Sequence, residues 1–122
     1  NEAIKYDKER VQFGKTIASF QNTQFKLAEM QTKVDAARLM TYRAAVTKDQ
    51  GKPYNVYAAM AKLLASDVAN EVTRGCVQLL GGYGYAREYT VERFMRDAKI
   101  TEIYEGTSEV MKMVISGSLN LK

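Results

Sequence analysis

Histidine and tryptophan are absent from this 122-residue sequence, and cysteine and proline occur once each. Without histidine the chain cannot build a Ser-His-Asp triad. With Cys76 as its single cysteine, it can neither close an internal disulfide nor supply the usual ligands of a structural zinc site, so no metal site is expected. Cys76 stands among apolar residues and is interpreted as a buried structural thiol. A carboxylate is therefore the natural candidate for a catalytic base.

Long apolar runs and clustered charge are also missing. No apolar stretch approaches the roughly 18 residues that a membrane span needs, and the polar opening NEAIKYDKER has no signal-peptide pattern. The net charge is +4, with Lys and Arg scattered among Asp and Glu, so nucleic acid is not an expected partner. A hydrophobic content of 46% argues against disorder, and the many Ala, Leu, Met, Lys, Glu and Gln residues favour helix.

Apolar residues recur at spacings of three, four and seven, which predicts an all-α chain. Helices are expected over residues 1–11, 17–48, 54–80, 91–99 and 108–119, with a glycine turn near residue 14 and an aromatic-rich loop over residues 81–90. The expected architecture is a single domain, residues 1–122, folded as an up-down four-helix bundle without strands. Because the first helix begins without an N-cap residue or lead-in, we expect the chain to be part of a longer protein.

The segment IYEGTS, residues 103–108, carries the strongest functional indication. Gly106 allows a tight turn beside the Glu105 carboxylate, and Thr107 is placed to cap the last helix through its hydroxyl. Backbone N–H groups exposed at such a helix start favour a polar or anionic ligand. Burial beside an apolar substrate would make the carboxylate a stronger base. The alternative is an ordinary solvated loop glutamate.

Two other segments combine polar side chains with glycines. In ERVQFGKTIASFQ, residues 9–21, Arg10 is expected at a helix end and Gln21 one turn into the long helix. An arginine fork suits phosphate oxygens, although a surface arginine would have the same spacing. In QLLGGYGY, residues 78–85, Gly81 and Gly82 would let a ligand approach the backbone closely, but a glycine pair is also a common helix stop.

In their order and spacing, these three motifs together resemble the C-terminal helical domain of the acyl-CoA dehydrogenases, over essentially the whole chain. The resemblance implies an FAD-dependent oxidation of an acyl-CoA thioester to the trans-2-enoyl-CoA, as in fatty acid β-oxidation. Glu105 would remove the α proton, Gly106 would contact the substrate, and the β hydrogen would leave as hydride to the flavin. A glutamate in this turn is typical of short- and medium-chain members. Electrons would pass to an electron-transferring flavoprotein, in the bacterial cytoplasm or the mitochondrial matrix.

The resemblance also implies the residues that contact FAD. They are Arg10, Gln21, Gln78, Leu79, Leu80, Gly81, Gly82, Thr107, Ser108 and Glu109. In the family the first seven positions reach the FAD of a neighbouring subunit and the last three contact the FAD of their own, which implies a homodimer or homotetramer. Glu109 departs from the family pattern, because many members carry glutamine there.

In the family an N-terminal helical domain and a middle β domain complete the flavin and acyl pockets. The chain alone is therefore expected to be inactive and to bind FAD weakly or not at all. Two alternatives remain open from the sequence. One is a relative with different chemistry, such as an acyl-CoA oxidase; the other is a helical oligomerisation module without catalysis.

Overall fold

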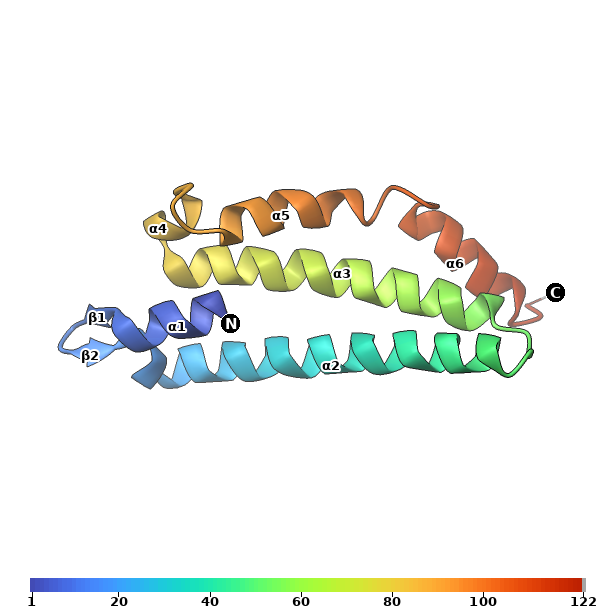
Figure 1. The fold of residues 1–122 in the computed structure, drawn as a ribbon, viewed down its shortest axis with the longest axis horizontal. Helices are drawn as coiled ribbons and strands as arrows, with labels where there is room; N and C mark the ends of the chain where they lie inside the picture. The colour runs from blue at the N-terminus through green and yellow to red at the C-terminus, as the bar shows by residue number, and fades with distance from the viewer. Residues whose placement is uncertain (122) are drawn as a thin grey trace.

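The computed structural model describes residues 1–121, which are mostly helical. Two long helices, α2 (Gln21–Asp49) and α3 (Asn55–Leu80), run antiparallel side by side (Figure 1). Helices α5 (Val91–Ile100) and α6 (Ser108–Gly117) follow one another along α3, which therefore lies in the middle of three antiparallel rows (Figure 1). The expected all-α, up-down bundle is confirmed.

Small side chains let α2 and α3 approach closely. Ala37 and Ala44 of α2 and Ala61 of α3 are all buried, which follows the alanine-rich stripes of the sequence. The connection between the two helices begins at Gly51, whose φ of 67° ends α2 in the expected place. Of the two long helices, α3 is the one against which α1, α4, α5 and α6 pack.

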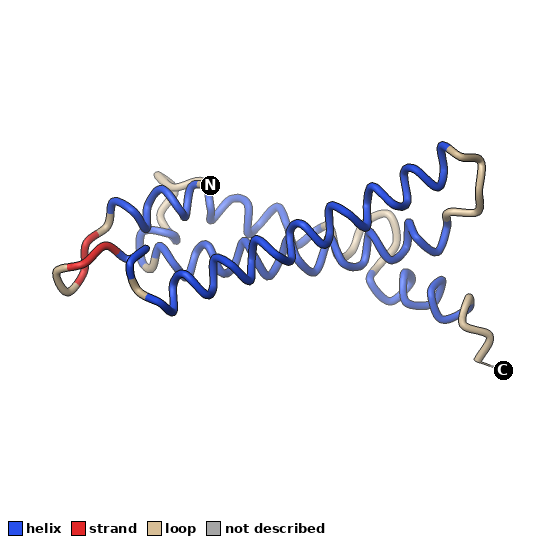
Figure 2. The backbone as a smooth tube through the Cα atoms, turned by 90° about the horizontal axis from the view of Figure 1, so that it is seen from below, coloured by secondary structure: helices blue, strands red, loops and turns tan. Residues whose placement is uncertain are grey.

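A short hairpin, which the sequence analysis did not predict, interrupts the N-terminal region. Helix α1 (Glu2–Glu9) ends earlier than expected and is followed by the antiparallel strands β1 (Val11–Gln12) and β2 (Lys15–Thr16). The two turn residues, Phe13 and Gly14, both have positive φ, 52° and 76°, as a tight two-residue hairpin turn requires. Figure 2 shows the hairpin projecting from one end of the molecule.

Because of the hairpin, the long helix α2 also begins later in the sequence than expected. The segment η1 (Ile17–Ser19) is a 3₁₀ turn and Phe20 is extended, so the prediction of α-helix from residue 17 was wrong for the first four residues. Two hydrogen bonds hold this local structure: Ile17 N–H donates to the Arg10 carbonyl at 2.9 Å, and the Ser19 hydroxyl donates to the Thr16 carbonyl at 2.7 Å. Gln21 is consequently the first residue of α2 rather than one turn inside it.

The expected loop over residues 81–90 contains one further helical turn, α4 (Gly82–Tyr85). Gly84 in this turn is buried against α3, where a methyl group would lie 2.4 Å from the carbonyl oxygen of Val77. At the other end of the chain, α6 ends at Gly117 instead of residue 119. None of the helices within residues 1–121 is both long and apolar enough to cross a membrane.

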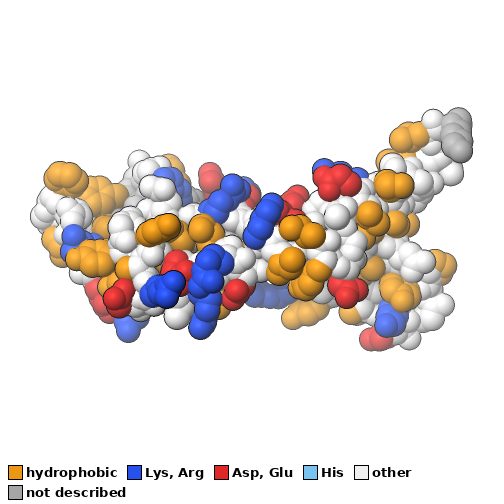
Figure 3. Space-filling view, turned by 90° about the horizontal axis from the view of Figure 1, so that it is seen from above, with side chains coloured by type: hydrophobic (Ala, Val, Ile, Leu, Met, Phe, Trp, Pro, Cys, Tyr) orange, Lys and Arg blue, Asp and Glu red, His pale blue; other side chains and the backbone are white. Residues whose placement is uncertain are grey.

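Large hydrophobic side chains remain on the surface of this domain. On the face shown in Figure 3 they lie between Lys or Arg and Asp or Glu side chains, without a single-sign patch. Phe13 at the hairpin tip is 94% exposed, Leu39 on α2 is 68% exposed and Met113 on α6 is 70% exposed.

Candidate functional site

The IYEGTS segment forms the connection between α5 and α6. Tyr104 N–H donates to the Ile100 carbonyl at 3.0 Å, which continues the last turn of α5, and Ser108 N–H donates back to the Glu102 carbonyl at 3.0 Å. These bonds close a short loop with Glu105 inside it. The structure therefore places the candidate base on a defined turn, as the sequence predicted.

The main chain at Glu105 adopts a conformation that few residues tolerate. Glu105 has a φ of 55° and Gly106 a φ of 96°. A side chain at Gly106 would be strained and would bring its Cβ within 2.7 Å of the Met111 methyl group. Non-glycine residues in the left-handed region are uncommon and cluster at functional sites.

The Glu105 side chain is exposed, and its carboxylate forms no hydrogen bond or ion pair within residues 1–121. Its backbone N–H has no acceptor among the same residues, so it remains available to a ligand.

The residues after the turn begin α6. The Thr107 hydroxyl accepts a hydrogen bond from Val110 N–H at 3.3 Å, which confirms the expected helix cap. The Ser108 hydroxyl oxygen is buried and has no partner within residues 1–121, so it can bond to a ligand or to another part of a larger protein. Glu109 points outward, with its carboxylate 4.0 Å from the Lys112 ammonium.

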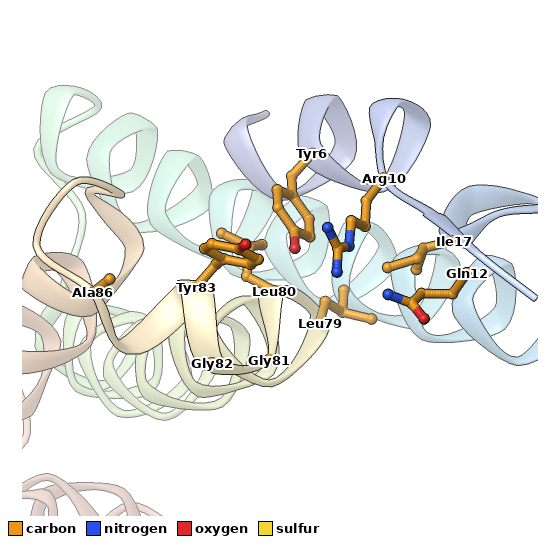
Figure 4. Close-up of a pocket in the computed structure, with 10 residues that line it drawn as sticks. All are labelled: Tyr6, Arg10, Gln12, Ile17, Leu79, Leu80, Gly81, Gly82, Tyr83 and Ala86. Carbon is orange, nitrogen blue, oxygen red and sulfur yellow. The ribbon is translucent and has the colours of Figure 1, made fainter.

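A second cluster lies at the opposite end of α3. A hollow of about 590 Å³ opens where the end of α1, the hairpin and the α3–α4 junction meet (Figure 4). Its lining residues are Tyr6, Arg10, Gln12, Ile17, Leu79, Leu80, Gly81, Gly82, Tyr83 and Ala86. The hollow brings together five of the predicted cofactor residues, which are Arg10, Leu79, Leu80, Gly81 and Gly82.

Arg10 supplies the cation of this hollow. It follows the last residue of α1, and its guanidinium lies 5.4 Å from the centre of the Tyr83 ring (Figure 4). Tyr83, Tyr6 and Tyr89 pack in tilted or edge-on pairs, with ring centres 5.6 to 6.2 Å apart. Burial raises the pKa of the Tyr6 hydroxyl, against the opposing effect of Arg10, so Tyr6 stays protonated and can donate a hydrogen bond.

At Gly81 the hollow is bordered by backbone that carries no side chain. Its φ of 61° and ψ of −137° are accessible essentially to glycine alone, and beyond its chain neighbours no atom of residues 1–121 lies within 4 Å of the position that a Cβ would occupy. A planar cation beside unobstructed glycine backbone suits a ligand that carries phosphate oxygens.

Gln21 and Gln78, the other two residues predicted to reach the FAD of a neighbouring subunit, do not line the hollow. Gln21 is exposed at the start of α2. Gln78 borders a separate groove between α2 and α3, together with Met30 and Gly75, although Leu79 reaches both surfaces. The structure thus divides the predicted cofactor residues between the hollow, its surroundings and the distant start of α6.

Sequence reasoning missed several residues of the hollow, chiefly Gln12, Ile17 and Tyr83. The QFG sequence around Phe13 and the tyrosine directly after the glycine pair were the available indications. Neither shows by itself that the hairpin and α4 border the same hollow.

The sequence matches known proteins along nearly its whole length. Residues 1–119 match the family described as "Acyl-CoA dehydrogenase, C-terminal domain". The chain is 57% identical over 118 residues to the short-chain specific acyl-CoA dehydrogenase of Megasphaera elsdenii, covering 97% of this chain and 31% of that protein. It is 50% identical over 117 residues to the mitochondrial short-chain specific acyl-CoA dehydrogenase of Rattus norvegicus, covering 96% of this chain and 28% of that protein.

Solved structures show the same fold. A chain in the structure described as "Electron transferring flavoprotein of Acidaminococcus fermentans" superposes with a TM-score of 0.96 at 56% identity, covering 99% of this chain and 32% of that chain. The sequence therefore spans about a third of the length of the relatives that it matches.

Proposed function

The chain belongs to the acyl-CoA dehydrogenase family, and from that premise we propose that it is the C-terminal domain of an FAD-dependent short-chain acyl-CoA dehydrogenase. The proposed reaction oxidises an acyl-CoA to the trans-2-enoyl-CoA. The observation that carries this proposal is the left-handed turn that presents the Glu105 carboxylate, with its own backbone N–H unpaired within residues 1–121. An N-terminal helical domain and a middle β domain would complete the site.

Glu105 has two roles in the proposed mechanism. Its carboxylate accepts the proton from the carbon next to the thioester carbonyl. Its N–H donates a hydrogen bond to the thioester oxygen, where negative charge develops as that proton leaves. The bonding electrons of the α C–H form the new C–C double bond as hydride departs from the β carbon. Bound FAD supplies the two-electron acceptor for that hydride.

The residues of this domain fit a flavin dinucleotide at two separate places. Arg10, beside the exposed backbone at Gly81, suits the pyrophosphate, while Gln21 and Gln78 would contact the same cofactor from outside the hollow. At the other place, the Ser108 hydroxyl, which has no partner within residues 1–121, could bond to a cofactor beside the Glu105 turn, together with Thr107 and Glu109.

These two places lie near opposite ends of α3 (Figure 1). Their separation supports a homodimer or homotetramer in which the hollow serves the FAD of a neighbouring subunit and the start of α6 serves the FAD of its own. Acyl-CoA and an electron-transferring flavoprotein are the proposed substrate and electron acceptor. The bacterial cytoplasm or the mitochondrial matrix is the proposed compartment.

The decisive experiment is flavin reduction in the full-length protein. Butyryl-CoA added without oxygen should bleach the flavin absorbance of the unaltered protein, and Glu105→Gln should abolish the bleaching while flavin stays bound. Unchanged bleaching in Glu105→Gln would place the base elsewhere. Fast reoxidation of the reduced flavin by oxygen would favour an acyl-CoA oxidase instead.

A further inference from the structure

Two polar side chains of α3 bind main-chain carbonyls on either side of the Glu105 turn. The Lys62 ammonium donates to the Gly106 carbonyl at 2.5 Å, and the Asn70 amide donates to the Ala98 carbonyl at 2.9 Å. Residues eight positions apart on an α-helix share a face and lie about 12 Å apart along its axis. Helix α3 therefore forms hydrogen bonds to the main chain before and after the turn.

The face that carries these two residues is turned into the protein. Ser66, midway between them, is only 4% exposed, and its hydroxyl donates to the Lys62 carbonyl at 2.8 Å. Asn70 also donates to the Ser66 carbonyl at 2.8 Å. The contacts of Lys62 and Asn70 are thus part of the packing between α3 and the segment that carries the base.

Lys62 is unusual among the lysines here because its partner is a carbonyl of a distant segment. The described residues supply no carboxylate within ion-pair distance of Lys62, whereas Lys33 pairs with Glu71 and Lys99 with Glu102. A hydrogen bond from a charged donor is about twice as strong as one between neutral groups, and it is shorter. The half-buried ammonium therefore fixes one particular peptide group, the one that follows Gly106.

That peptide group directly follows the part of the turn with positive φ. A non-glycine residue at a φ of 55°, such as Glu105, persists only where its surroundings hold it. Ser108 N–H closes the loop onto the Glu102 carbonyl, but this bond joins two parts of the loop itself. The bond from Lys62 ties the loop to the helical framework.

We propose that Lys62 is a positioning residue for the Glu105 base. By fixing the Gly106 carbonyl, it sets the direction of the Glu105 side chain and of the Glu105 N–H relative to the thioester. The inference rests on the proposed function, in which Glu105 removes the α proton. Misplacing a reacting group by about 1 Å can lower a rate about 100-fold, so loss of this bond should affect proton removal more than substrate binding.

The test uses the full-length flavoprotein with three variants. Lys62→Met removes the ammonium and keeps the length of the side chain, and Lys62→Arg retains a charged donor. Lys48→Met is the matched control, because Lys48 and Lys62 both line a further groove between α2 and α3, which Ala44 and Ala61 also border, but the Lys48 ammonium lies over the Tyr54 ring. The readouts are the anaerobic rate of flavin bleaching by butyryl-CoA, the slowing caused by deuterium at the α carbon, and amide hydrogen exchange at Ser108.

Lys62→Met should lower the bleaching rate by about 10- to 100-fold, with flavin content unchanged. The α-deuterium effect should increase, because proton removal becomes more strongly rate-limiting, and Ser108 N–H should exchange faster. Lys62→Arg should recover a large part of the rate, and Lys48→Met should stay within about two-fold of the unaltered protein, since its contact lies away from the turn.

An unaltered bleaching rate and deuterium effect in Lys62→Met would overturn the proposal. A fall in the bleaching rate that only parallels loss of bound flavin, or an equal fall in Lys48→Met, would also overturn it. Should Lys62→Met fail to fold, Lys62→Gln decides, because full activity without the charge and length of lysine would equally overturn the proposal.

Glu105→Gln separates the role of Lys62 from the proposed role of Glu105 as the base. Turnover in that variant would refute the proposed base, whereas an inactive Glu105→Gln beside a normal Lys62→Met would refute only the role of Lys62.

Discussion

Replacing Gly84 by alanine tests how the hollow around Arg10 is built. An added Cβ would lie 2.4 Å from the Val77 carbonyl oxygen, 2.9 Å from the Leu80 Cβ and 3.0 Å from the Val77 Cα. Carbon atoms normally pack about 3.5 to 4.0 Å apart, so α4 would have to move away from α3 by about 1 Å. Two of the three obstructing atoms belong to the main chain of α3, which cannot move aside as a flexible side chain would.

Overpacking of this kind costs about 1 to 3 kcal/mol, and the rigid obstruction places Gly84→Ala near the upper end of that range. The movement would also carry Tyr83 away from Arg10, which now lies 5.4 Å from the ring centre. We therefore expect the full-length protein to unfold at a lower temperature and to retain less flavin. Thermal unfolding and the flavin-to-protein absorbance ratio measure the two effects.

Gly117→Ala is the matched control, because Gly117 ends α6 and, apart from its chain neighbours and the backbone of its own helix, no atom of residues 1–121 lies within 4 Å of its Cβ position. Alanine is favoured over glycine in helices by about 0.5 to 1 kcal/mol, so this control should be neutral or slightly stabilising. An unfolding temperature and flavin content for Gly84→Ala equal to those of the unaltered protein would refute the reasoning.

Three further predictions concern buried groups and the domain in isolation. Asp7 is fully buried, and its carboxylate has no partner within residues 1–121. Because burial raises the pKa of this carboxyl group, the folded state loses stability as pH rises through the raised pKa. Asp7→Asn should accordingly raise the unfolding temperature at pH 8 and lose this advantage towards pH 4, and an equal effect at both values would contradict the account. Burial also raises the pKa of the Cys76 thiol, so iodoacetamide at pH 8 should alkylate the native protein far more slowly than the urea-unfolded protein. FAD titrated into the isolated chain should show weak binding or none, because Glu105 and the hollow around Arg10 are open; tight one-to-one uptake would contradict this expectation.

The long helices could be predicted from the sequence because their apolar stripes repeat over many turns. The start of α2 could not, because the chain before Gln21 is held by a bond between Ile17 and Arg10 across the hairpin. Strands of two residues are also too short to show an alternating pattern. Local hydrogen bonds that return the chain on itself therefore overrode a helical pattern that was otherwise favourable.

Only part of the candidate site, likewise, could be predicted from the sequence. The Glu105 turn and the Thr107 cap depend on residues close together in sequence, and both were predicted from the IYEGTS segment. The role in FAD binding of the remaining residues stays a prediction. Lys62 could not be identified from sequence, because its partner, Gly106, lies 44 positions further along the chain.

Helix α3 connects the two candidate regions as a rigid spacer. Lys62 holds the turn of the proposed base, and Leu80, 18 positions later, lines the hollow beside Arg10. At 1.5 Å per residue, these points lie about 27 Å apart along the helix axis. One inserted or deleted residue between them would rotate the hollow by about 100° relative to the turn as well as shifting it. Substitutions in this stretch can thus be absorbed locally, whereas a change in its length would alter the geometry of both regions at once.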